Sequence, residues 1–179
     1  AFSNNNYVAN IARANLSVVP LAPDGALCVY NSSRTDVLVD VFGSVGPSPG
    51  PGPSSDLAFD PVSPVRLSDS RAGPLLPAGT ITRVATVMPG TQAALVNLTT
   101  IASIGEGFLS ADKCSRLLAG PPPFSNGNFG MIDASANTSI VELDNDGAFC
   151  VYNSTPTHLI VDLQGRFDSG APRGISLIE

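Results

Sequence analysis

Tryptophan is absent from the chain, histidine occurs once, and lysine and arginine together occur only nine times in 179 residues. The basic residues are scattered and are outnumbered by 15 aspartates and glutamates, which gives a formal net charge of −6. Because such a chain repels phosphate groups, we expect neither nucleic acid nor an anionic membrane surface as a partner. No apolar run approaches the roughly 20 residues that cross a bilayer, so we expect no membrane insertion.

Turn-forming residues are abundant instead, with 17 glycines and 16 prolines. Between them lie short runs of Thr, Val, Ser and Asn, which are typical of an all-β protein with many short strands. The hydrophobic share of 43% is sufficient for a packed core. No signal peptide opens the sequence, so for a secreted protein we expect a mature form or a fragment.

One stretch of the sequence occurs twice. Residues 1–45, shifted by 122 positions, align without a gap to residues 123–167, so that Cys28 falls on Cys150. In the best-matching stretches roughly half of the aligned residues are identical, as in DGALCVYNS and DGAFCVYNS, which indicates a duplicated structural unit.

Each copy is predicted to form a three-strand meander. An Asp-Gly pair, Asp24-Gly25 or Asp146-Gly147, separates the first two strands, because glycine adopts the positive φ of a tight turn at little cost. Apolar and polar residues alternate in the third strand, as expected for one buried face. The predicted strands are 16–21, 26–30 and 37–41 in the first copy and 138–143, 148–152 and 159–163 in the second.

The division of the chain follows from this repeat. Residues 1–45 are the first B half, and residues 121–168 contain its second copy, the second B half. Residues 46–56, GPSPGPGPSSD, are predicted to be a linker. The A half, residues 57–120, has no N-terminal counterpart, and residues 169–179 form a tail. Further strands are predicted at 80–87, 93–100 and 108–111.

The predicted fold is therefore all-β, an antiparallel β-sandwich or jelly-roll-like domain with duplicated three-strand units. The A half and the second B half form one complete module over residues 57–168. The first B half is half a module, and an isolated three-strand sheet would expose an apolar face. We expect it to pack on the sandwich, on a neighbouring chain or on upstream sequence.

The pairing of the three cysteines can be inferred from this division into A and B halves. If the A half and the second B half make one domain, Cys114 and Cys150 are the natural disulfide, and Cys28 is free or bonded to another chain. Three buried thiols are the alternative. A disulfide would indicate an extracellular setting.

Residues 57–168 contain, in order, the motifs FDP (59–61), PVRLSDSR (64–71), LPAGT (76–80), LVNLT (95–99), GFL (107–109) with Cys114, SNGNF (125–129) and the stretch 146–167. These motifs, and residues 1–45 for the B part, are similar to a β-rich repeat module of secreted actinobacterial cell-envelope proteins. This resemblance implies a secreted or cell-envelope setting and a non-catalytic accessory role. Ser70 stands where that family usually has threonine, and the first B half lacks its A half.

Two motifs that suggest chemistry have simpler structural explanations. A Ser-His-Asp or Cys-His site needs a histidine base, but the only histidine, His158, lies in a predicted strand and has Asp36 as its repeat counterpart. Residues 144–147, DNDG, resemble the start of a calcium loop but lack the downstream glutamate. We interpret them as a turn, and we expect no catalytic residues, metal or other cofactor.

Charged residues at matched positions are interpreted as structural. Asp69 lies between Arg66 and Arg71, and bidentate Arg–carboxylate bonds can pin a loop to a sheet. Asp40 and Asp162 occupy equivalent places in apolar strands, where a carboxylate needs a partner, and Arg66 or Arg71 is the expected one.

Amides beside an aromatic ring are the only candidate ligand-binding groups in the sequence. Such groups can bind sugar hydroxyls and the apolar face of a sugar ring, although Asn-rich turns have the same composition. The candidates are Asn4, Asn6 and Tyr7 in the first copy and Asn126, Asn128 and Phe129 in the second.

The favoured function is a non-catalytic, extracellular or cell-surface module for adhesion or for binding cell-envelope carbohydrate. The alternative is a structural subunit of an extracellular filament or coat that is assembled by β-complementation between subunits. The expected partners are accordingly a cell-envelope polysaccharide or other copies of the chain.

Overall fold

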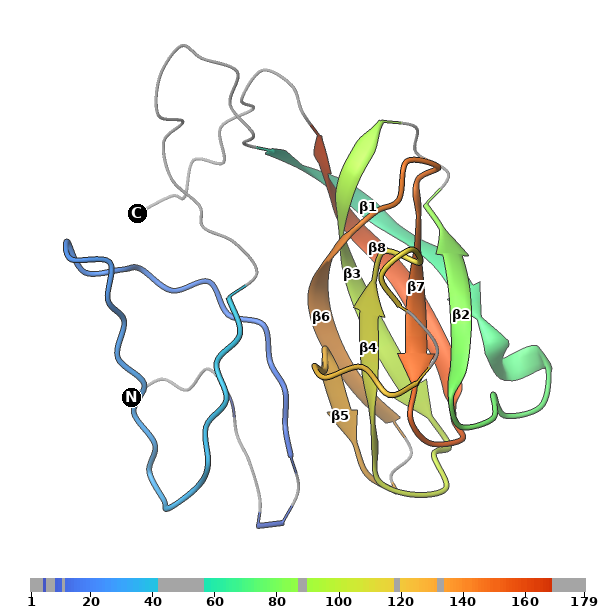
Figure 1. Ribbon diagram of the computed structural model, residues 1–179, viewed down its shortest axis with the longest axis horizontal. Helices are drawn as coiled ribbons and strands as arrows, with labels where there is room; N and C mark the ends of the chain where they lie inside the picture. The colour runs from blue at the N-terminus through green and yellow to red at the C-terminus, as the bar shows by residue number, and fades with distance from the viewer. Residues whose placement is uncertain are drawn as a thin grey trace.

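The computed structural model describes residues 5, 9–10, 12–41, 57–86, 90–117, 120–131 and 134–168. Within these residues eight strands form two antiparallel four-stranded sheets that stack as a β-sandwich (Figure 1), which confirms the predicted fold class. A 3-10 turn, η1 (Ser70–Ala72), follows the first strand. The predicted linker, residues 46–56, and the tail, residues 169–179, lie outside the described residues.

The two sheets have similar strand orders. The first is β1-β8-β3-β6 and the second is β2-β7-β4-β5. The strands are β1 (Ala58–Asp69), β2 (Thr80–Ala85), β3 (Thr91–Ile101), β4 (Gly107–Asp112), β5 (Gly127–Phe129), β6 (Ala134–Glu142), β7 (Ala148–Asn153) and β8 (His158–Asp168).

Strands of the A half and of the second B half alternate in both sheets. Strands β1 to β4 come from the A half and β5 to β8 from the second B half, so each B strand is hydrogen-bonded only to A strands. The predicted meander is therefore wrong, although its three strands exist. Strands β6 and β8 lie in the first sheet and β7 in the second, because the chain crosses between layers at each turn.

The core lies between the sheets and is built by both halves. Val96 and Leu98 of β3 meet Phe149 of β7 and Val161 and Leu163 of β8, and all five are at most 1% exposed. Full burial of such a side chain stabilises a fold by roughly 1.5–3 kcal/mol. Since neither half can bury its apolar residues alone, the two halves fold together.

Strand β1 was not predicted, because Pro61 and Pro64 disfavour a strand in the sequence. In the structure β1 is an edge strand that pairs only with β8. Its register shifts between Pro61 and Val65 and again between Arg66 and Ser68. An edge position and irregular register accommodate proline, since an edge strand needs only half of its backbone donors.

The first B half differs from its prediction. Residues 12–41 contain no strand, and Figure 1 draws them as a blue trace without arrows. Their Asp-Gly turn is formed: the Gly25 N–H donates to the Ala22 carbonyl at 2.8 Å, as the Gly147 N–H donates to the Asp144 carbonyl at 2.9 Å. The turn depends on local residues only, whereas the strands of the second B half depend on an A half.

Candidate functional site

The predicted disulfide is present. Cys114 and Cys150 are joined with an S–S distance of 2.08 Å, whereas Cys28 is free and exposed. Cys114 follows β4, and Cys150 lies on β7 opposite Asp112, so the bond connects the end of the A half to the second B half. Leu117, Tyr152 and Phe108 pack around it in a second apolar cluster.

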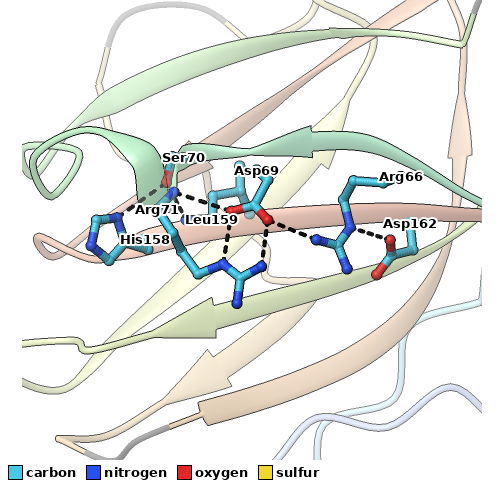
Figure 2. A network of polar contacts seen from close by, with 7 residues as sticks. All are labelled: Arg66, Asp69, Ser70, Arg71, His158, Leu159 and Asp162. Carbon is cyan, nitrogen blue, oxygen red and sulfur yellow. Dashed lines mark hydrogen bonds and ion pairs between the residues drawn. The ribbon is translucent and has the colours of Figure 1, made fainter.

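A polar network connects β1 to β8 at the surface of the first sheet (Figure 2). Arg66 donates from Nε to Asp162 and from Nη1 to Asp69 Oδ2 at 2.7 Å. Arg71 binds the same carboxylate with two parallel bonds, at 2.9 Å from Nε and 2.6 Å from Nη2. Asp162 is thus paired with Arg66, one of the two arginines expected as its partner, and two guanidinium groups are balanced by two carboxylates.

Hydrogen bonds set the charge states in this network. The side chain and backbone N–H of Arg71 hold the pKa of Asp69 far below its ordinary value. The bonds to Asp162 and Asp69 raise the pKa values of Arg66 and Arg71, respectively. Arg66, Asp69 and Arg71 are therefore charged at neutral pH, and the arrangement is an ion-pair cross-link rather than a poised acid or base.

We expect Asp69→Asn to change the acid sensitivity of the fold. Because the pKa of Asp69 is lower in the folded than in the unfolded protein, its stabilisation is full above the unfolded value of about 4 and is lost as the pH falls below it. Urea-unfolding midpoints measured from pH 7 to pH 2 should decline less steeply in the variant. Arg71→Ala should likewise reduce the decline of the urea midpoint at low pH. A decline as steep as that of the unmodified protein in both variants would contradict a stabilising role for the Asp69–Arg71 pair.

His158 has a structural environment. Its Nδ1 lies 3.4 Å from Ser70 Oγ, which is also shown in Figure 2. That hydroxyl oxygen accepts a hydrogen bond from the Leu159 backbone N–H at 2.9 Å. A serine nucleophile needs its histidine oriented by a third group, and the two contacts instead tie η1 to the start of β8.

A second polar cluster, not predicted from the sequence, surrounds the disulfide. Lys113 and Arg116 both bind Glu142, at 3.0 and 2.9 Å, and Ser115 Oγ donates to Asp144 at 2.6 Å. The bonds from Lys113 and from Ser115 lower the pKa values of Glu142 and Asp144, respectively. Only the spacing of Lys113 and Arg116 around a cysteine could have suggested it, since Glu142 and Asp144 lie 26 or more residues away from the residues that bind them.

In residues 144–147, which resemble the start of a calcium loop, both aspartates bind other side chains of the protein. Asp144 accepts the Ser115 bonds, and Asp146 is paired with Arg83 at 2.6 Å. Among the described residues there is no group of three or more His, Cys, Asp or Glu side chains that could hold a metal ion.

The amide and aromatic candidates separate in the structure. Asn126 is 3% exposed, and its Oδ1 accepts from the Ala111 backbone N–H at 2.7 Å, while Phe129 is a core residue. Asn128 is partly exposed, and its Oδ1 accepts from Ser125 Oγ. The three side chains therefore do not form a common ligand surface. Asn4, Asn6 and Tyr7 lie outside the described residues.

Asp40 has a different environment from its repeat counterpart. Asp162 is paired with Arg66, whereas Asp40 is exposed in residues 12–41. The expected architectural Asp–Arg pairing is therefore present in only one of the two copies that the structure describes.

Comparisons with known proteins do not assign a family. Neither a scan against protein-family models nor searches of curated proteins and of solved structures found a match to the chain. No helix in the described part of the chain is long and apolar enough to cross a membrane.

Proposed function

We propose that the protein is a non-catalytic, extracellular surface module that binds a cell-envelope polysaccharide. One observation carries this proposal: the outer face of β3 and β6 presents amide and hydroxyl groups, and the one charged residue of these two strands, Glu142, is paired with Lys113 and Arg116. Asn97 lies opposite Thr138, and Asn97 Nδ2 donates to Thr99 Oγ1 at 3.1 Å. All three residues are partly exposed, because they alternate with the buried core residues of these strands.

The distribution of charge supports this choice of ligand. Thirteen charged residues in the described part of the chain form ion pairs with one another: Asp60, Arg66, Asp69, Arg71, Arg83, Asp112, Lys113, Arg116, Glu142, Asp146, Asp162, Arg166 and Asp168. A neutral polymer rich in hydroxyl groups matches the amide and hydroxyl groups of Asn97, Thr99 and Thr138, which both donate and accept hydrogen bonds. The disulfide supports a setting outside the cell, where such bonds persist.

Retention of the full chain on insoluble cell-wall polysaccharide tests this function. The double variant Asn97→Ala, Thr138→Ala should weaken binding about tenfold, since it removes one or two hydrogen bonds. Ile81→Ala is the matched control, because Ile81 lies on the outer face of the second sheet and is also exposed. No retention of the unmodified chain, or equal losses in both variants, would contradict the proposal.

A second candidate is a structural subunit of an extracellular coat or filament. Residues 12–41 favour it, since they expose apolar side chains whose counterparts in the second B half are buried in the core. Residues 12–41 of one subunit would then complete a sandwich with a neighbouring polypeptide. Size-exclusion chromatography and electron microscopy of the chain mixed with a polypeptide that carries a further A half test it, and discrete complexes without polymers would overturn it.

A further inference from the structure

The second B half shows what a B half needs in order to form strands. Strand β6 is hydrogen-bonded to β3, β7 to β2 and β4, and β8 to β1 and β3. All of these partners belong to the A half. A B half without an A half therefore has no partner for any of its backbone ladders, whatever its own sequence.

The first B half keeps the side chains that contact an A half. Cys28 stands at the position of Cys150, which is bonded to Cys114, and Asp40 stands at the position of Asp162, which is bonded to Arg66. Apolar residues are kept at the core positions too. Tyr30, Val29, Val37, Val39 and Val41 stand at the positions of Tyr152, Val151, Leu159, Val161 and Leu163.

The two copies differ sharply in exposure. Val39 and Val41 are 59% and 82% exposed, whereas their counterparts Val161 and Leu163 are 0% and 1% exposed. Tyr30 is 90% exposed against 7% for Tyr152. The first B half thus has the residues of a buried sandwich layer and lacks only the layer that covers them.

We propose that residues 12–41 form a second β-sandwich with a polypeptide segment that has the residue pattern of the A half, and that Cys28 is disulfide-bonded to that segment. This inference is independent of polysaccharide binding. Copies of the chain cannot complete each other, because each brings one A half and two B halves, and one B half per chain would always remain. The partner segment is therefore an A half other than residues 57–120 of this chain.

The covalent step is an ordinary thiol oxidation. The thiols of Cys28 and of the partner cysteine lose two protons and two electrons as the S–S bond forms. An external disulfide such as oxidised glutathione accepts them and leaves as two thiols. The partner cysteine would occupy the position that Cys114 has in the A half, since Cys28 occupies the position of Cys150.

A fusion tests the proposal with the full chain. A second copy of residues 57–122 is placed directly before Ala1, which stands at the position of Pro123, so the fusion reproduces the 36-residue separation between the two cysteines. Oxidised with glutathione, the fusion should show backbone amides 26–30 and 37–41 exchanging hydrogen at least about 100-fold more slowly than in the unfused chain. A non-reducing mass map should show Cys28 bonded to the Cys114 of either A half.

Two variants of the fusion separate the contribution of the disulfide from that of strand pairing and core packing. Cys28→Ser should retain the slow exchange, because the ladder bonds do not depend on the disulfide. Val96→Asp with Leu98→Asp in the added copy only should restore fast exchange, since both positions are buried in an A half. Exchange in residues 12–41 as fast as in the unfused chain, with Cys28 still open to alkylation, would overturn the proposal.

Discussion

Replacing Phe149 with alanine is expected to lower the free energy of unfolding by about 3–5 kcal/mol. Phe149 is the largest fully buried side chain, at 0% exposure, and it lies on β7 among core residues from both sheets. The substitution removes apolar contacts and leaves a cavity that close-packed strands cannot fill. Urea unfolding of the oxidised protein, followed by circular dichroism, measures the change.

The repeat supplies a matched control for this variant. Leu27 occupies the equivalent position in the first B half and is 41% exposed. Leu27→Ala should therefore change the free energy of unfolding by less than about 0.5 kcal/mol. Similar losses in Leu27→Ala and Phe149→Ala would contradict the finding that, of the two B halves, only the second contributes residues to the core.

Removing the disulfide is expected to have an effect of similar size. Cys114 and Cys150 are 36 residues apart, and the chain-entropy description gives a loss of about 4 kcal/mol for a loop of that length. The double variant Cys114→Ser, Cys150→Ser should show this loss in the urea midpoint, because its unfolded chain is no longer constrained. The double variant avoids leaving an unpaired thiol in the apolar cluster.

Cys28→Ser is the control for the disulfide. Cys28 is exposed and free, so its replacement should leave the stability unchanged to within about 0.5 kcal/mol. A loss in Cys28→Ser comparable to that of the double variant would show that thiol pairing differs from the Cys114–Cys150 bond.

The sequence was sufficient to predict the fold class and most strands of the sandwich. Alternation and turn residues located β2, β3, β4 and β7 to within a few residues, because each of these strands contributes apolar residues to the core. Strand β1 was missed because its prolines are tolerated only in an edge strand. Whether a strand lies at the edge depends on how all the strands of the sheet are ordered, which the sequence does not show.

A residue's role in the candidate site could be predicted only where it follows from the residue type and from the apolar residues beside it in the sequence. A carboxylate in an apolar strand needs a cation, so an arginine partner was expected for Asp162, and Arg66, one of the two candidates, is that partner. Asn126 and Phe129 were chosen because amides and aromatic rings bind sugars. In the structure the Asn126 side chain instead accepts a hydrogen bond from the Ala111 N–H, and the Phe129 ring packs in the core. Composition does not distinguish these two uses.

The two B halves show which features are local. Both Asp-Gly turns form with positive φ at the glycine, 81° at Gly25 and 73° at Gly147, although their surroundings differ. The sequence by itself determined these turns, because their hydrogen bonds join residues at most four apart. Only the tertiary structure decided which copy has strands, since a strand's backbone bonds and its buried face both belong to a partner that is distant in the sequence.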